Sequence, residues 1–273
     1  MKSSTLDNFS STKEDLSKCI SDISSWMSNN KLKLNPDKTE VLAASTTNLL
    51  KEVRNDTILL EENNLSIQTS VKYLGVKIDS SLCMSSQIKA ISKSCFLELR
   101  RISSIRKFLS HKAVKTLVCS KILPRLDYCN SIFIGMTESN FTRLQRIQNC
   151  AAKLIYKKKK FDHVTPLLRD LHWLPVRARC IYKIAVLAYK FFDGSLPKYL
   201  SDLLTVKHTQ RNLRSSSQKL LTRPRCSLKN FGERSFYFVA PKIWNDLPTS
   251  VRNAPSVETF KKHLKTHLFV KYL

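Results

Sequence analysis

The chain has 273 residues, 42% of them hydrophobic, which is enough apolar sequence for a folded core and excludes a disordered chain. Its 47 lysines and arginines exceed its 21 acidic residues by 26 charges, and an excess of this size indicates a polyanionic partner. With only four glycines, the chain has no P-loop and no dinucleotide-binding motif, and no apolar run approaches the roughly 20 residues of a membrane helix.

The net charge is unevenly distributed. Residues 1–80 contain 10 lysines and arginines and 11 acidic residues, a net charge of −1, whereas residues 81–273 contain 37 and 10, a net charge of +27. Basic residues alternate with apolar ones rather than gathering in tails, so we expect them on folded surfaces that contact phosphates. The alternative is a merely solvated basic surface. The change in charge predicts a functional boundary near Ser80.

The first 80 residues are expected to form a small α/β region. A capping box at Ser11 and Glu14 predicts a helix that ends near Asn30, and its apolar residues recur at helical spacing on one face. Alternating patterns and turn residues then predict strands, the middle two paired as a hairpin. These strands cover residues 38–44, 58–60, 65–68 and 71–78.

After Ser85 the pattern becomes helical. Ser110 and Ser256 are expected to be N-caps, and Pro124 is expected to break a helix. Residues 207–230 form an irregular basic stretch, with short strands expected near 220–221 and 228–231. Predicted helices begin at Ser85, Ser110, Thr137, Thr165, Arg177, Glu233 and Ser256. The fold class is therefore α+β and mostly α.

No catalytic or metal-binding site is predicted. The eight cysteines show no C-x-x-C spacing, and His263 and His267, although four residues apart on one helix, have no third ligand in view. Neighbouring aspartates of the Asp-Asp or Asp-x-Asp kind, which two-metal chemistry would use, do not occur. The cysteines are expected to be free thiols, mostly in the core, in a reducing compartment, so we expect an intracellular protein of the nucleus or cytoplasm.

Basic residues on the helices are the candidate binding residues. Around the apolar face of residues 85–107 the sequence places several lysines and arginines, Arg106 and Lys107 among them, and the helix after Thr137 runs into four consecutive lysines. Such residues suit a phosphate backbone. The predicted nucleic-acid-binding residues of the two helices are Lys89, Lys93, Arg100, Arg101, Arg143, Arg146, Lys153, Lys157, Lys158, Lys159 and Lys160.

Several segments in colinear order resemble one protein family. The segment from Trp26 to Glu40 contains Lys-Leu-Asn-Pro-Asp-Lys-Thr-Glu, and the segment from Val71 to Asp79 reads Val-Lys-Tyr-Leu-Gly-Val-Lys-Ile-Asp. Both resemble reverse transcriptases of non-LTR retrotransposons (LINEs) of the Jockey or chicken-repeat type. Further resemblances cover residues 143–152, 171–177, 240–248 and 260–269.

The resemblance implies a partial polymerase. Residues 1–80 would be part of a palm with primer-grip-like strands, residues 81–160 a thumb, and residues 161–273 a C-terminal helical region. Lys72, Tyr73 and Gly75 match the primer grip, which would contact nucleic acid, and Lys38 would lie near the nucleotide in the intact family. The family's metal-binding aspartates would precede this sequence, since lone Asp7 does not match them.

These implications lead to a specific expectation. The chain would bind RNA, DNA or their hybrid without polymerising alone, and it would hold no cofactor, although the intact family uses Mg²⁺. An apolar palm face on residues 1–80 would be left for protein contact. Two alternatives are a domesticated or vestigial protein-interaction scaffold without nucleic-acid function and an open reading frame without selected function. Salt-dependent binding to a duplex separates the first expectation from the scaffold.

Overall fold

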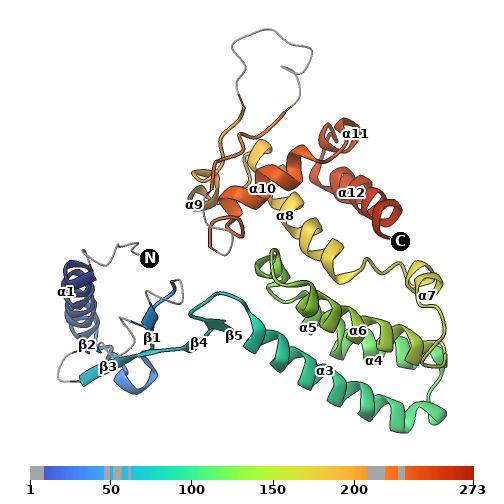
Figure 1. The fold of residues 1–273 in the computed structure, drawn as a ribbon, viewed down its shortest axis with the longest axis horizontal. Helices are drawn as coiled ribbons and strands as arrows, with labels where there is room; N and C mark the ends of the chain where they lie inside the picture. Colours follow the sequence, from blue (N-terminus) through green and yellow to red (C-terminus); the bar gives the residue numbers. More distant parts are fainter. Residues whose placement is uncertain (1–8, 46–49, 52–56, 61–62, 208–218, 227–230) are drawn as a thin grey trace. The chain divides into compact units, whose positions relative to one another are not determined.

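The computed structural model describes residues 9–45, 50–51, 57–60, 63–207, 219–226 and 231–273 (Figure 1). The chain forms two compact units, residues 1–86 and 87–273, called the N-terminal unit and the C-terminal unit below. The unit border lies six residues beyond the change in charge expected near Ser80. Helices dominate and the strands are short, which confirms the α+β, mostly α fold class.

The N-terminal unit combines one long helix with two small sheets. In the first sheet β3 lies in the middle, parallel to β1 and antiparallel to β2, and β4 pairs with β5 in the second. The β2–β3 hairpin confirms the predicted pairing. The elements are α1 (Phe9–Asn29), η2 (Pro36–Lys38), β1 (Val41–Leu42), β2 (Thr57–Leu60), β3 (Asn63–Gln68), β4 (Ser70–Tyr73) and β5 (Val76–Asp79).

Three details of this unit differ from the sequence-based expectation. The helix begins at Phe9, so Ser11 lies inside it rather than capping it, and residues 38–44 contribute only a two-residue strand. The predicted single strand over 71–78 is instead the β4–β5 hairpin. Leu74 (φ 47°) and Gly75 (φ 85°) both have left-handed backbones, as a two-residue hairpin loop requires. Leucine is unusual at such a position, so the alternating pattern of residues 71–78 predicted a single strand without a turn.

The C-terminal unit is helical, and an isolated bridge joins Val206 to Leu221. A strand expected near 220–221 is thus reduced to a single bridged residue, and most of the one expected at 228–231 lies outside the described residues. The helices are α3 (Ser85–Ile105, at the unit border), η3 (Arg106–Phe108), α4 (His111–Lys121), α5 (Leu123–Asp127), η4 (Asn130–Phe133), α6 (Glu138–Ile155), α7 (Thr165–Asp170), α8 (Val176–Phe192), α9 (Lys198–Ser201), α10 (Phe236–Asn245), α11 (Thr249–Arg252) and α12 (Val257–Tyr272).

Most helix starts agree with the sequence. Ser110 Oγ accepts a hydrogen bond from Ala113 N over 3.2 Å, and Ser256 Oγ accepts one from Thr259 N over 3.2 Å, which confirms both predicted N-caps. The helix broken at Pro124 divides into α4 and α5. The helix predicted to begin at Thr165 does begin there, but Thr165 is its first helical residue and Val164 occupies the N-cap position.

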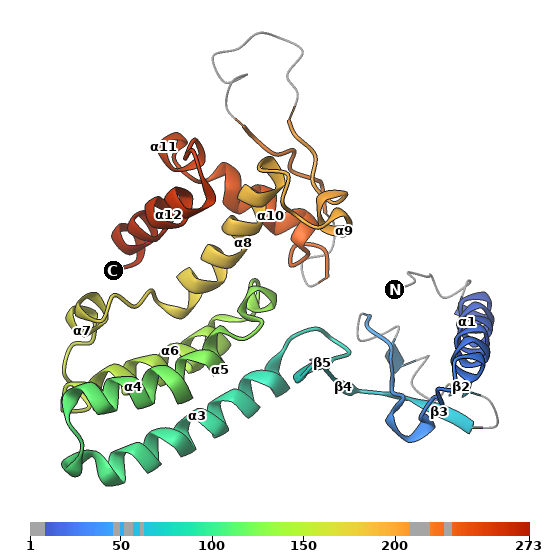
Figure 2. The ribbon, with the colours of Figure 1, turned by 180° about the vertical axis from the view of Figure 1, so that it is seen from behind.

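An aromatic cluster forms the core around α8, which packs against α10 and α12 (Figures 1 and 2). Tyr189 of α8 stacks on Phe260 of α12 with ring centroids 4.4 Å apart, and its hydroxyl donates to the carbonyl oxygen of Ala254 over 2.7 Å. Trp244 of α10 is fully buried beside them. The boundary expected at residue 160 falls within this unit, between α6 and α7.

The cysteines differ from expectation in their burial. All eight are free thiols, as predicted, but only Cys95 and Cys180 are buried in the core. Burial raises the pKa of Cys95 to about 11 and that of Cys180 to about 12, so both stay protonated at neutral pH and are poor nucleophiles.

Candidate nucleic-acid interface

A basic stripe runs along the exposed side of α3. Lys89, Lys93 and Arg100 lie at helical spacing on the side opposite the buried Ile88, Ile91 and related residues. None of the three forms an ion pair with a residue that the structure describes. Arg101 differs, because its guanidinium pairs with the Glu98 carboxylate over 2.9 Å. The stripe thus presents three uncompensated positive charges.

A second stripe follows α6. Arg143 and Arg146 are exposed, while Phe141, Leu144 and Ile147 of the same helix are buried. Arg146 lines a shallow hollow together with Gln145, Asn149 and Arg177. The Arg177 guanidinium is held there, 4.2 Å from the centroid of the Phe141 ring and paired with Glu138. Arg146 and Arg177 thus bring two positive charges to this hollow.

The four lysines after α6 belong to an ordered turn. Lys158 N donates to the carbonyl oxygen of Lys153 over 2.9 Å, and Lys157 has a left-handed backbone (φ 54°), the arrangement of a Schellman helix end that normally uses glycine. Lys159 N donates to the Asp162 carboxylate over 2.7 Å. The ammonium groups of Lys157, Lys158 and Lys159 therefore project from a fixed backbone.

Lys153 has a structural role that the sequence did not suggest. Its ammonium donates to the carbonyl oxygen of Lys160 over 2.6 Å. This hydrogen bond links the end of the turn formed by residues 157–160, called the lysine turn below, to α6. The side chain is half-buried, so Lys153 stabilises the lysine turn and is less accessible to solvent than the four lysines of the turn.

Arg106 is buried rather than part of the basic surface. Its guanidinium donates to the carbonyl oxygens of Leu154, Ile155 and Leu109 over 2.9 to 3.0 Å. The last carbonyls of a helix have no partner within the helix, and Arg106 satisfies two of those on α6. Arg106 thereby joins the C-terminal end of α3 to the start of the lysine turn.

Tyr156 strengthens the same junction. Its ring lies 5.1 Å from that of His111 at the start of α4, and its hydroxyl donates to the Asp170 carboxylate of α7. Burial, followed by the hydrogen bond to Asp170, raises the pKa of Tyr156 to about 12. Four segments of the C-terminal unit therefore meet around the end of α6.

The predicted primer-grip residues lie in the N-terminal unit. Lys72, Tyr73 and Gly75 are on the β4–β5 hairpin, and Tyr73 is 64% exposed. Lys72 is directly opposite Lys77 in the register of the two strands, where like charges are unfavourable without a counter-charge. Lys77, which the sequence did not single out, thus lies on the same face of the hairpin as Lys72.

Lys38 lies near this hairpin through its neighbour. Lys38 ends η2 and is exposed, and two residues later the Glu40 carboxylate accepts a weak hydrogen bond from Lys72 N over 3.4 Å. The structure thus connects the segments of Lys38 and Lys72.

Asp79 anchors the end of the hairpin. Burial favours the neutral carboxyl group, but hydrogen bonds from Ser81 Oγ over 2.7 Å and Cys83 N over 2.8 Å outweigh it and lower the pKa. The carboxylate therefore organises the connection into α3.

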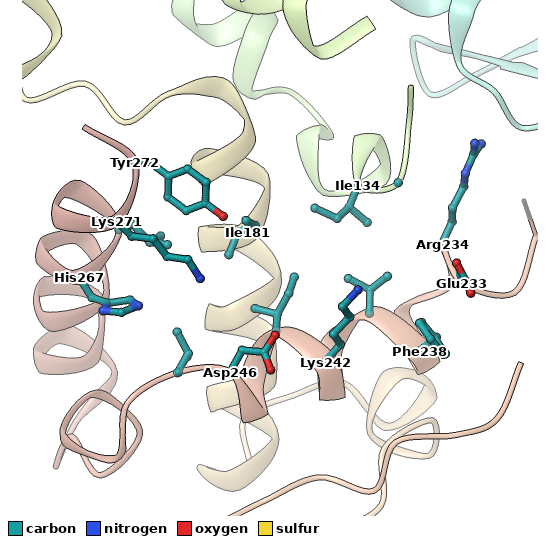
Figure 3. A pocket seen from close by; sticks show the side chains of 15 residues that line it. Ile134, Ile181, Glu233, Arg234, Phe238, Lys242, Asp246, His267, Lys271 and Tyr272 are labelled. Carbon is teal, nitrogen blue, oxygen red and sulfur yellow. The ribbon is translucent and has the colours of Figure 1, made fainter. Parts of the chain in front are cut away.

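A cavity of about 350 Å³ lies among α8, α10 and α12 (Figure 3). Ile181, Ile243 and Leu268 are among its apolar lining residues, and Lys242 and Lys271 also line it. Burial and the nearby Lys271 lower the pKa of His267 on the same wall. None of the residues predicted to bind nucleic acid lines this cavity, so it is separate from the basic stripes.

Metal ligands do not gather in the part of the chain that the structure describes. No three histidine, cysteine, aspartate or glutamate side chains there lie close enough to hold a metal ion. His267 faces the cavity, whereas His263 is exposed. Among the described helices, none combines the length and apolar character that crossing a membrane requires.

Comparison with known proteins identifies one related sequence. No protein-family model and no solved structure matches the chain. The chain is 28% identical over 163 residues, 58% of its length, to a Drosophila melanogaster protein named "Probable RNA-directed DNA polymerase from transposon BS". It spans 17% of that protein's length. Over this part, the sequence is thus similar to a protein named as a transposon RNA-directed DNA polymerase.

Proposed function

We propose that this chain is a fragment of a LINE-type retrotransposon reverse transcriptase and that it binds template–primer nucleic acid, mainly through the C-terminal unit. The observation that carries the proposal is the pair of exposed basic stripes on α3 and α6. The similarity to a transposon RNA-directed DNA polymerase supports the same class of partner.

The dimensions of α3 suit a nucleic-acid backbone. Lys89 and Arg100 are eleven residues apart in a continuous helix, which corresponds to about 16 Å along its axis. One strand of a duplex advances about 3.4 Å per phosphate, so the stripe extends along roughly five phosphates of one strand. In this proposal the α6 stripe and the lysine turn add further phosphate contacts, and Lys72, Tyr73 and Gly75 contact the primer.

A binding titration with an RNA–DNA hybrid tests the proposal. The affinity is expected to fall steeply as salt rises, because each phosphate contact releases counterions. The double variant Arg143→Ala/Arg146→Ala should weaken binding and reduce the salt slope by about two units. Lys262→Ala/Lys265→Ala, two exposed lysines of α12, is the matched control and should change binding less. Binding that does not depend on salt would overturn the proposal.

The isolated chain is proposed not to polymerise. Its sequence contains no neighbouring aspartate pair, and Lys38 alone supplies no metal site. The expectation is tested by primer extension with Mg²⁺ on an RNA template. Robust incorporation of nucleotides by the pure chain would contradict it.

A protein-interaction surface on α1 is the second candidate. Leu16, Ile23 and Trp26 recur at helical spacing and are 38%, 47% and 61% exposed, and Cys19 between them is exposed too. Such an uncovered stripe is typical of a protein contact. Because the chain spans 17% of its relative, we propose that another part of a longer polymerase covers the stripe.

A fluorescent apolar probe tests this second surface. The wild-type chain should bind the probe through α1, and Leu16→Ser/Ile23→Ser/Trp26→Ser should remove that binding without changing affinity for the hybrid. Equal probe binding by both proteins would contradict the proposed surface. Loss of hybrid binding in the triple variant would instead place α1 in the nucleic-acid site.

A further inference from the structure

Two lysine–phenylalanine pairs project from the C-terminal unit. Phe108 is 77% exposed and Phe161 is 89% exposed. The Lys107 ammonium lies 4.8 Å from the centroid of the Phe108 ring, and the Lys160 ammonium lies 5.6 Å from that of Phe161. Each exposed ring is therefore accompanied by the positive charge of the lysine that precedes it in the sequence.

The fold brings these pairs to the same end of the unit. Phe108 closes η3, whose Arg106 is hydrogen-bonded to Leu154 and Ile155 at the end of α6, and Phe161 follows six residues after that end. Figures 1 and 2 both show the α3–α4 and α6–α7 connections at the same end. We call Lys107, Phe108, Lys112, residues 157–160 and Phe161 the aromatic end.

The chemistry of the aromatic end favours unpaired nucleotides. Large apolar rings exposed to water are unfavourable unless a partner covers them, and six lysines around them would repel a basic partner and attract phosphates. Proteins that hold single strands combine such cations with aromatic rings on which bases stack. A duplex offers phosphates but keeps its bases stacked inside, so it would leave the two phenylalanines uncovered except at its ends.

We propose that the aromatic end binds a single-stranded segment of nucleic acid, with bases stacked on Phe108 and Phe161 and phosphates beside the lysine turn. This inference rests on the proposed function and names the form of nucleic acid that this end receives. It adds a single-strand site to the duplex contacts proposed for the α3 and α6 stripes.

The test compares a single-stranded oligouridylate with an RNA–DNA hybrid of similar length, both of about 12 nucleotides per strand. Phe108→Ala and Phe161→Ala should each weaken binding of the single strand roughly 5-fold to 100-fold and leave hybrid binding and the salt slope unchanged. Phe161→Tyr keeps a stacking ring and should restore binding. Tyr199→Ala, at a 72% exposed aromatic residue on α9, is the matched control and should have no effect.

The outcomes separate this inference from the proposed function. If the wild-type chain binds the hybrid but the phenylalanine variants keep their full affinity for the single strand, the single-strand site at the aromatic end is overturned and the proposed function stands. Equal losses for both probes overturn it as well, because the rings would then act on every ligand. A wild-type chain that binds neither probe overturns both proposals. Phenylalanine-dependent binding to anionic lipid vesicles, with oligouridylate binding unchanged, would assign the rings to a membrane surface instead.

Discussion

The Arg106 guanidinium donates through Nη2 to the carbonyl oxygen of Ile155 over 2.9 Å, so an arginine between α3 and α4 completes the end of α6. The same group donates through Nε to the carbonyl oxygen of Leu154 over 3.0 Å. A buried cation here is compensated by carbonyl dipoles at a helix C-terminus, where the helix dipole favours positive charge. The lysine turn and the aromatic end both depend on this junction.

Replacement of Arg106 should therefore destabilise the C-terminal unit. Arg106→Ala leaves buried carbonyl groups without donors, and we expect it to lower the free energy of unfolding by about 2–3 kcal/mol. Denaturant titration measures this change. Arg101→Ala, which removes an exposed arginine paired with Glu98, is the control and should cost less than about 1 kcal/mol. Equal stability of the two variants would contradict the proposed junction.

Lys157 should impose strain that glycine would relieve. A residue with a side chain in the left-handed region costs about 1 kcal/mol relative to glycine, and Lys157 has a φ of 54°. Lys157→Gly is thus expected to raise the melting temperature while weakening nucleic-acid binding. The neighbouring Lys158→Gly, at a position without positive φ, should weaken binding similarly without stabilising the fold. A lower melting temperature for Lys157→Gly would refute the prediction.

The β4–β5 turn should also be improved by substitution. Leu74, 74% exposed with a φ of 47°, precedes Gly75 at a position where hairpin loops favour asparagine. Leu74→Asn is expected to stabilise the hairpin by about 1 kcal/mol, and amide hydrogen exchange at Tyr73 and Val76, the pair that flanks the loop, would measure it. Gly75→Ala is the opposite test, since alanine disfavours the φ of 85° there, and it should speed exchange at the same amides.

Asp79 should make the N-terminal unit sensitive to acid. The pKa of its carboxyl group is below the ordinary value, so the ionised form is favoured by folding. Its contribution to stability is present at neutral pH and is lost as pH falls through this lowered pKa. Asp79→Asn should reduce the free energy of unfolding at pH 7 by about 1–2 kcal/mol and flatten its dependence on pH below about 4. An unchanged acid transition in Asp79→Asn would show that other groups control it.

Local chemistry made much of the fold predictable. Ser110 and Ser256 cap helices through their own side chains, and Phe260, Leu264 and Leu268, which recur at helical spacing, are all buried. The turns at Leu74 and Lys157 were harder to predict, because both residues have left-handed backbone conformations that glycine or asparagine usually adopts. The backbone conformation at both positions is determined by the surrounding structure rather than by the intrinsic preference of the residue.

The sequence by itself determined the charge split near Ser80, the helical character of the remainder and the basic residues on α3 and α6, because charge and periodicity are properties of local sequence. Only the tertiary structure decided which cations meet solvent. Arg106 is buried because the carbonyls of Leu154 and Ile155, about fifty residues away in sequence, lie beside it. Lys153 is bound to the Lys160 carbonyl for the same reason: hydrogen-bonding partners are chosen by proximity in space. That proximity also assembles Phe108 and Phe161 at one end of the unit.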